Sequence, residues 1–154
     1  MSNFRFHNRN RDGTIKIMKE SKNKGSPVAS RTRNIFYWIT TGLVTFELIY
    51  GALWDFDIVN KGYVRSIMQH LGYPAYYSLI LGVCKLPAAV VLLLPGLPRL
   101  KEWAYAGTFF IFGGAVASHL LADYMGSPMV FAGVYAGLTI ASWALRPQSR
   151  RIGD

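Results

Sequence analysis

The sequence predicts an all-α integral membrane protein, in which a disordered cationic tail precedes an up-down bundle of four membrane-spanning helices. Of its 154 residues, 51% are apolar and only 16% are charged, which is unusual for a water-soluble domain. The apolar residues gather in four runs, and most basic residues lie outside these runs. A single cysteine excludes a disulfide scaffold, and a basic tail without a basic folded face argues against nucleic-acid binding.

Residues 1–34 form the predicted tail. They hold nine of the 17 basic residues and two of the eight acidic ones, and so carry most of the formal charge of +9. Their few apolar side chains cannot offset the entropy lost on ordering, so we expect disorder. The segment is too long for the basic region of a signal peptide, and the apolar run after it lacks a clear small-x-small cleavage site.

Four apolar stretches follow, each of roughly 18 to 22 residues, the length that a helix needs to cross about 30 Å of hydrocarbon. We predict spans at about 35–54, 73–94, 103–122 and 128–145, within a domain of residues 35–146 that is followed by a short basic tail, 147–154. Small residues spaced by four predict where these helices pack closely. They are Gly133, Gly137 and Ala141, then Gly114 and Ser118, then Ser78 and Gly82.

The connections between the spans differ in length. Those after the second and third spans have about eight and five residues, which favours antiparallel neighbours in an up-down bundle. The first connection, 55–72, is longer and places Val64, Ile67, Met68 and Leu71 at i, i+3, i+4 and i+7. This pattern predicts a short amphipathic helix on the outer interface or over the bundle mouth, either as a stabilising element or as a lid.

The basic residues also predict the orientation. With four spans, the tail, the 95–102 loop and the segment after residue 145 share one side and hold 14 of the 17 Lys and Arg residues. The two loops on the other side hold only Lys61 and Arg65. The positive-inside rule therefore places both termini in the cytoplasm, and Trp54 falls near the outer interface as part of an aromatic belt.

Three ionisable side chains fall inside the spans, where each charge costs roughly 2.5 to 3.5 kcal/mol on insertion scales. Glu47 and Lys85 lie at similar depths, so we predict a buried ion pair between them. Asp123 follows His119 by four residues, so its carboxylate can hold one imidazole nitrogen. The candidate catalytic residues are Lys85, His119 and Glu47, and the candidate ligand contacts are Asp123, Ser118 and Tyr50.

Other chemistry has less support. Cys84 has no second cysteine in the chain, which excludes vicinal-dithiol chemistry within one chain, and we expect a buried apolar side chain. His119 and Asp123, even with Asp55 or Asp57, are too few ligands for a tightly held metal, and the sequence contains no flavin, haem or iron–sulfur motif. Stoichiometric zinc, copper or iron in the purified protein would contradict this prediction.

Four motifs stand out in the membrane part: LGYPAY at 71–76, LGVCK at 81–85, LLPGLPRLKEWAYAG at 93–107 and ASHL at 117–120. Together they resemble the DoxX-like family of small four-helix membrane proteins, over about residues 37–147. The resemblance implies a role near quinone or thiol redox chemistry, because the family takes its name from a membrane subunit associated with thiosulfate:quinone oxidoreduction. The positions that match the family pattern are Lys85, Lys101–Glu102–Trp103 and Ser118–His119. Lys101 and Glu102 are expected to meet water at the cytoplasmic interface.

The expected function is to bind a quinone-like or other small apolar ligand within the bundle and to support a redox step, as an oxidoreductase or one of its subunits. Lys85 and His119 would donate hydrogen bonds or protons to ligand oxygens, and Glu47 with Asp123 would tune them. Electrons would come from the ligand or from a soluble or membrane redox partner. The residues leave open a non-redox enzyme acting on a lipid or isoprenoid, a small permease, an accessory scaffold, and a homo-oligomer.

Overall fold

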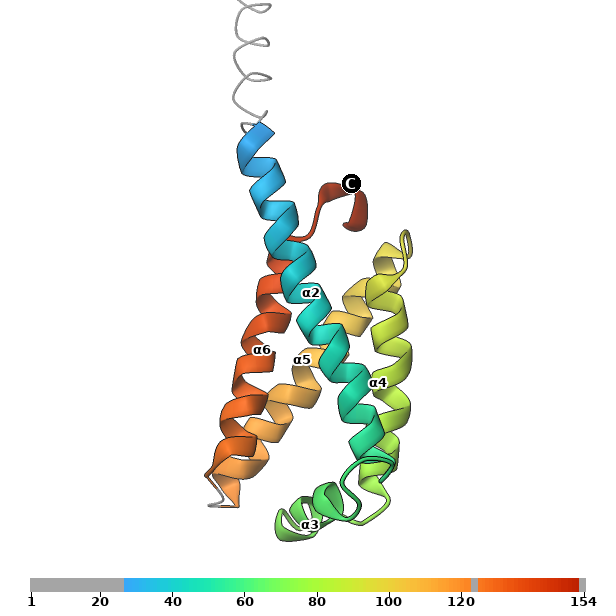
Figure 1. Cartoon of the computed structure of the whole chain (residues 1–154), viewed down its shortest axis with the longest axis vertical. Coiled ribbons are helices and arrows are strands. Elements are labelled where there is room, and N and C mark those ends of the chain that lie inside the picture. The colour runs from blue at the N-terminus through green and yellow to red at the C-terminus, as the bar shows by residue number, and fades with distance from the viewer. Residues whose placement is uncertain (1–26, 123–124, 153–154) are drawn as a thin grey trace, which may run out of the picture. The chain divides into compact units, whose positions relative to one another are not determined.

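The structure, a computed structural model, describes residues 27–122 and 125–152, and within these ranges it is all-α with no strand (Figure 1). This confirms the all-α part of the predicted fold. The chain divides into two units, residues 1–33 and 34–154, and the packing described below lies within the second. The helices are α2 (Pro27–Asp55), α3 (Tyr63–His70), α4 (Tyr77–Leu93), α5 (Pro98–Leu121) and α6 (Ser127–Leu145), followed by the 3-10 turn η1 (Gln148–Arg150).

Three helices are long and apolar enough to cross a membrane: Ser30–Asp55 within α2, all of α5, and all of α6. The fourth apolar helix, α4, has 17 residues and is shorter than the predicted span. The first helix begins at Pro27, so residues 27–34 are helical, although we expected them to belong to the disordered tail. Residues 1–26, the rest of that tail, lie outside the described residues.

Proline and glycine set the remaining helix ends. Gly96 and Leu97 both adopt left-handed backbone conformations, with φ of 71° and 54°, and they separate α4 from α5. Pro98 then opens α5, since proline is favoured in the first turn, where its missing N–H is not needed. The helix therefore begins five residues before the start that hydrophobicity alone predicts.

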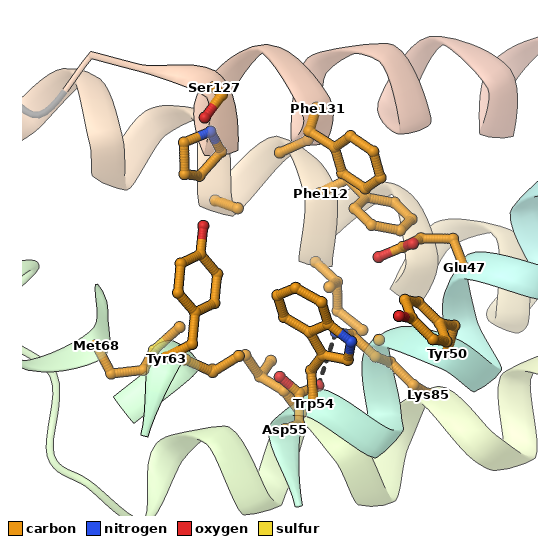
Figure 2. Close-up of a pocket in the computed structure, with 17 residues that line it drawn as sticks. Glu47, Tyr50, Trp54, Asp55, Tyr63, Met68, Lys85, Phe112, Ser127 and Phe131 are labelled. Atoms are coloured by element: carbon orange, nitrogen blue, oxygen red, sulfur yellow. Dashed lines mark ion pairs between the residues drawn. The ribbon is translucent and has the colours of Figure 1, made fainter. Parts of the chain in front are cut away.

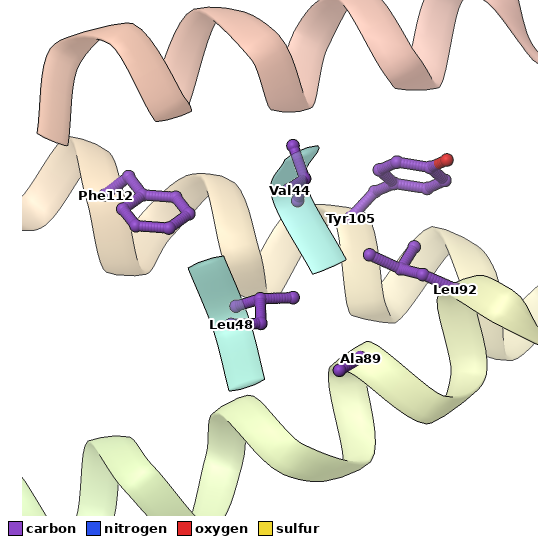
Figure 3. Packing of buried hydrophobic residues seen from close by; sticks show 6 residues of the cluster. All are labelled: Val44, Leu48, Ala89, Leu92, Tyr105 and Phe112. Atoms are coloured by element: carbon purple, nitrogen blue, oxygen red, sulfur yellow. The ribbon is translucent and has the colours of Figure 1, made fainter. Parts of the chain in front are cut away.

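The core joins α2, α4 and α5 (Figure 3). It consists of Val44, Leu48, Ala89, Leu92, Tyr105 and Phe112, with Tyr135 and Leu138 of α6 packed against it. Direct contacts join α4 to α5 and α5 to α6. The hydroxyl groups of Thr41 and Ser142 lie 2.7 Å apart and link α2 to α6. These contacts place α2, α4, α5 and α6 around one interior.

The interior is rich in hydroxyl groups, and the outer face is apolar. Thr41, Thr108 and Ser142 are fully buried, whereas Leu121 is 89% exposed and Phe110 is 72% exposed. Some buried hydroxyls, such as that of Thr45, donate to the carbonyl oxygen one turn back. A water-soluble protein rarely exposes so much contiguous apolar surface, whereas hydrocarbon around the helices would solvate it.

The small-residue rows have different outcomes. Gly82 is buried, and a Cβ added there would lie 2.9 Å from the ring of Phe56 and 3.2 Å from Cβ of Asp55, so this row allows α2 and α4 to approach closely. A Cβ at Gly114 or Gly137 would meet nothing within 4 Å. The prediction of close packing was wrong at these two glycines; on α6, the residues that face inward are Ala132, Thr139 and Ser142.

Cys84 is exposed on α4, although we expected it to be buried. The reason is the neighbouring residue: Lys85 points inward to an acidic partner, and successive helical residues point about 100° apart. With Lys85 facing the interior, the Cys84 side chain is turned toward the outer surface.

Candidate functional site

A cavity of about 350 Å³ lies among α2, α3, α4, α5 and α6 (Figure 2). Its volume is in the range typical of pockets for small molecules. The lining contains two acidic residues and a lysine, Glu47, Asp55 and Lys85, and five aromatic residues, Tyr50, Trp54, Tyr63, Phe112 and Phe131. The other lining residues are mostly small or apolar: Gly51, Val64, Met68, Leu81, Ile111, Ala115, Ser127, Pro128 and Ala132.

Lys85 and Asp55 form an ion pair in this wall, with Nζ 2.7 Å from Oδ2. Lys85 is 8% exposed and Asp55 5% exposed, so the pair is almost out of reach of solvent. Within the described residues the ion-pair partner of Lys85 is therefore Asp55, and the predicted pair with Glu47 was wrong. Glu47 and Asp55 lie on the same face of α2, eight residues or about 12 Å of helix rise apart, and counting depth from the helix ends selected the wrong one of the two.

Gly51 separates the two carboxylates on that face, four residues from each. A Cβ at Gly51 would lie 2.9 Å from Oε1 of Glu47 and 3.0 Å from Nζ of Lys85. Because Gly51 has no side chain, a space is left at this position. The Glu47 carboxylate lies on one side of the space and the Lys85 ammonium on another. Glu47 is half-buried, and among the described residues no hydrogen bond or ion pair holds its carboxylate. Figure 2 shows this carboxylate directed into the cavity near Phe112 and Tyr50.

Aromatic rings form two walls of the cavity. On one side, Tyr50 contacts Trp54 at a centroid distance of 5.8 Å, and Trp54 meets Tyr63 edge-on at 5.1 Å. On the other side, Phe112 comes from α5 and Phe131 from α6. A flat or branched apolar group between these walls would contact ring surfaces, and the charged groups would lie at one edge of it (Figure 2).

The short helix α3 closes part of the cavity. Two of the predicted amphipathic positions, Val64 and Met68, line it together with Tyr63. Asp57 fixes the start of this helix, because it accepts a hydrogen bond from the backbone N–H of Gly62 at 3.1 Å and pairs with Arg65 at 2.8 Å. Apolar residues of the amphipathic pattern therefore form part of the cavity wall.

The other predicted site residues lie elsewhere. His119 is 3% exposed and follows Ala115 by one turn of α5, but it is not among the residues that line the cavity. The hydroxyl of Ser118 shares a 2.8 Å hydrogen bond with the hydroxyl of Tyr73. Asp123 lies outside the described residues, so its contact with His119 stays a prediction. The structure thus brings Glu47, Tyr50 and Lys85 together, whereas Ser118 and His119 do not line this cavity.

Lys101 is fully buried, although we expected it to meet water. Its ammonium donates to the carbonyl oxygens of Val91, Leu92 and Leu94, at the C-terminal end of α4. These carbonyls have no partner within their own helix, and a cation at this end also interacts favourably with the helix dipole. Arg150 donates to the carbonyl oxygen of Leu92 as well, at 3.1 Å.

Glu102 links α5 to α6 at the same end of the bundle. It accepts a hydrogen bond from the Arg146 guanidinium at 2.6 Å and another from the indole N–H of Trp143 at 2.8 Å. Trp103, in contrast, is 76% exposed. The Lys101–Glu102–Trp103 group thus joins helix ends, and none of its members lines the cavity.

Among the charged and aromatic residues of the cavity, those that the sequence did not single out as a site are Asp55, Trp54, Tyr63, Phe112 and Phe131. A signal for Asp55 was present, because it follows Glu47 by eight residues and so shares its face of α2. The aromatic residues gave no such signal, since phenylalanine and tyrosine are common throughout apolar helices and Trp54 fits an interfacial belt equally well.

Apolar helices with an apolar outer face, a hydroxyl-rich interior and charged groups beside an internal cavity define an α-helical membrane protein. The chain belongs to the DoxX-like family: residues 39–142, about two thirds of its length, match that family. This confirms the resemblance seen in the sequence motifs. Comparisons with curated proteins and with solved structures give no match.

Proposed function

We propose that this protein binds a small quinone-like molecule in the cavity and supports a redox step on it. The observation that carries the proposal is the combination, around one cavity, of a buried ammonium, a half-buried carboxylate and several aromatic rings. The rings offer stacking surfaces for a conjugated ring system. The charged groups offer hydrogen bonds to the oxygens that such a ring carries.

Lys85 is the proposed donor to a ligand oxygen. An ammonium group has three N–H donors. The ion pair with Asp55 occupies one of them, which leaves donors for a ligand oxygen. Glu47 is the proposed acceptor for a ligand hydroxyl, because its carboxylate is directed into the cavity (Figure 2). These two residues take the place that the sequence hypothesis gave to Lys85 and His119. Electrons would come from the ligand itself or from a redox partner subunit.

The proposed setting is a bacterial inner membrane. We propose that α2, α4, α5 and α6 cross it as an up-down bundle, with both termini in the cytoplasm and α3 on the outer side. Two features support this: most basic residues gather on one predicted side, and the helix faces that point outward are apolar. The cavity would then open near the outer half of the bilayer.

Calorimetric titration of the purified protein, in lipid nanodiscs, with a short-chain benzoquinone analogue tests the proposal. We expect saturable binding, and a loss of about tenfold or more in affinity in Lys85→Met, because the donor to the ligand oxygen is removed. Arg99→Met is the matched control, since it removes an exposed cation outside the cavity. Equal affinity in wild type and Lys85→Met would refute the role of Lys85 and, with it, the proposed site.

A further inference from the structure

The formal charges around the cavity do not cancel. Two carboxylates, Glu47 and Asp55, face one ammonium, Lys85, so the wall carries one net negative charge when all three are ionised. The ion pair at 2.7 Å matches Lys85 with Asp55. Among the described residues, Glu47 has no ion-pair or hydrogen-bond partner, and it borders an apolar space. In a medium of low dielectric constant, a charge gains far more from an opposite charge than it does in water.

The surroundings of Glu47 favour an organic cation over a metal ion. Aromatic ring faces attract cations, and the rings of Tyr50, Trp54 and Phe112 line the same cavity. A hard metal ion requires several oxygen ligands, whereas Asp55 is already occupied by Lys85 and leaves one carboxylate. A quaternary ammonium needs no directed ligands, and its methyl groups can contact ring faces directly.

We propose that the cavity also binds hydrophobic organic monocations, with the positive charge beside Glu47 and the apolar part between Trp54 and Phe131. This rests on the proposed function only in taking the cavity to be a ligand site. It assigns Glu47 a separate role, as the electrostatic partner of the cation. Binding is reversible and involves no covalent step, and a monocation restores neutrality to the wall.

An isosteric ligand pair tests the charge directly. Benzyltrimethylammonium and neopentylbenzene have the same shape, with nitrogen replaced by carbon, so their difference in affinity reports the charge. We measure equilibrium binding of both to the full-length protein in nanodiscs. The cation should bind about tenfold or more tightly than the neutral compound. Equal affinities would overturn the proposal.

Two substitutions locate the effect. Glu47→Gln should abolish the preference for the cation, and Glu102→Gln, which removes a carboxylate remote from the cavity, should preserve it. Lys85→Met leaves two carboxylates without an ammonium and should strengthen cation binding, a gain that misfolding cannot produce. Persistence of the preference in Glu47→Gln, or weaker cation binding in a folded Lys85→Met variant, would overturn the assignment.

The same titrations separate this inference from the proposed function. Binding of the benzoquinone analogue without a preference for the cation refutes the inference alone. Preference for the cation without any binding of the benzoquinone analogue refutes the quinone proposal and supports the inference.

Discussion

Lys85 and Asp55 form an ion pair that is almost closed off from solvent, and removal of one partner leaves the other as an uncompensated buried charge. We therefore expect Lys85→Met or Asp55→Leu alone to lower the free energy of unfolding by about 3–5 kcal/mol. The double variant should recover most of that loss, because no buried charge remains. Unfolding in detergent micelles, analysed as a double-mutant cycle, measures the coupling.

Additive effects of the two substitutions would contradict this account of the pair. The double variant also bears on the scaffold alternative. A scaffold in which the pair only locks the bundle should keep its function when both residues are replaced. The proposed quinone site should lose ligand affinity even where stability recovers.

Gly82 provides a second test at the residue scale. A methyl group there would lie 2.9 Å from the ring of Phe56 and 3.2 Å from Cβ of Asp55, so Gly82→Ala should force α2 and α4 apart. We expect a destabilisation of about 1–3 kcal/mol, as for other overpacked sites. Gly107→Ala is the control, since no atom lies within 4 Å of its Cβ position. The control should be neutral or stabilised by up to about 1 kcal/mol, through helix propensity.

A Gly82→Ala variant as stable as the Gly107→Ala control would show that the contact is not tight. Ligand affinity in Gly82→Ala is a further readout, because Asp55 holds Lys85 in the cavity wall. Displacement of Asp55 should weaken binding of the benzoquinone analogue even if the protein stays folded.

The sequence predicted which charged residues lie within the bundle but not how they pair. Glu47 and Lys85 were found because ionisable groups are rare in apolar helices. Their pairing depends on helix rotation and on the open space above Gly51, neither of which hydrophobicity reports. Lys101 shows the same limit. Its position near a helix end led us to expect a side chain in contact with water, but its ammonium donates to carbonyl oxygens at the end of the preceding helix.

At the scale of helices, the C-terminal end of α4 depends on side chains from outside it. Lys101 donates to three carbonyl oxygens there, so Lys101→Met should leave those of Val91 and Leu94 without this donor, while that of Leu92 keeps the bond from Arg150. We expect a loss of at least about 2 kcal/mol in unfolding free energy, since hydrogen bonds to charged groups are among the stronger ones. Arg99→Met, two residues earlier and exposed, should change stability little. Thermal unfolding of both variants in the same detergent compares them.

Similar melting temperatures for Lys101→Met and Arg99→Met would contradict the capping role of Lys101. Loss of stability with unchanged ligand affinity is the expected outcome. It would separate this end of the bundle from the cavity and explain the Lys101–Glu102–Trp103 positions without catalysis.

Helix positions were easier to predict than helix ends. Apolar runs located α2, α4, α5 and α6, because length and hydropathy together determine a candidate span. Their boundaries moved where turn chemistry acts: Pro98 starts α5 early, and α4 starts at Tyr77, after Pro74, four residues later than predicted. The amphipathic pattern in the first connection located the region of α3, but only the folded arrangement shows Val64 and Met68 in the cavity wall.

At the scale of the whole molecule, the proposed topology predicts which loops are reachable from outside the cell. In a Cys84→Ser background, which removes the single native thiol, Asn60→Cys lies before α3 and Ser149→Cys lies after α6. A membrane-impermeant maleimide should label Asn60→Cys in intact cells. It should label Ser149→Cys only after permeabilisation, because the positive-inside rule keeps that end in the cytoplasm. The reverse pattern would invert the orientation.

The length of α4 has a consequence for the surrounding lipid. Its 17 residues give a helix of roughly 25 Å, against about 30 Å for the hydrocarbon layer of a typical bilayer. The three candidate spans contain 26, 24 and 19 residues, so in the proposed bundle the hydrophobic mismatch would be greatest beside α4. If α4 crosses the membrane as we propose, thinning of the bilayer beside it would bring headgroups and interfacial water closer to Lys85, which lies midway along that helix. Membrane thickness would then change how much water reaches the charged residues of the cavity.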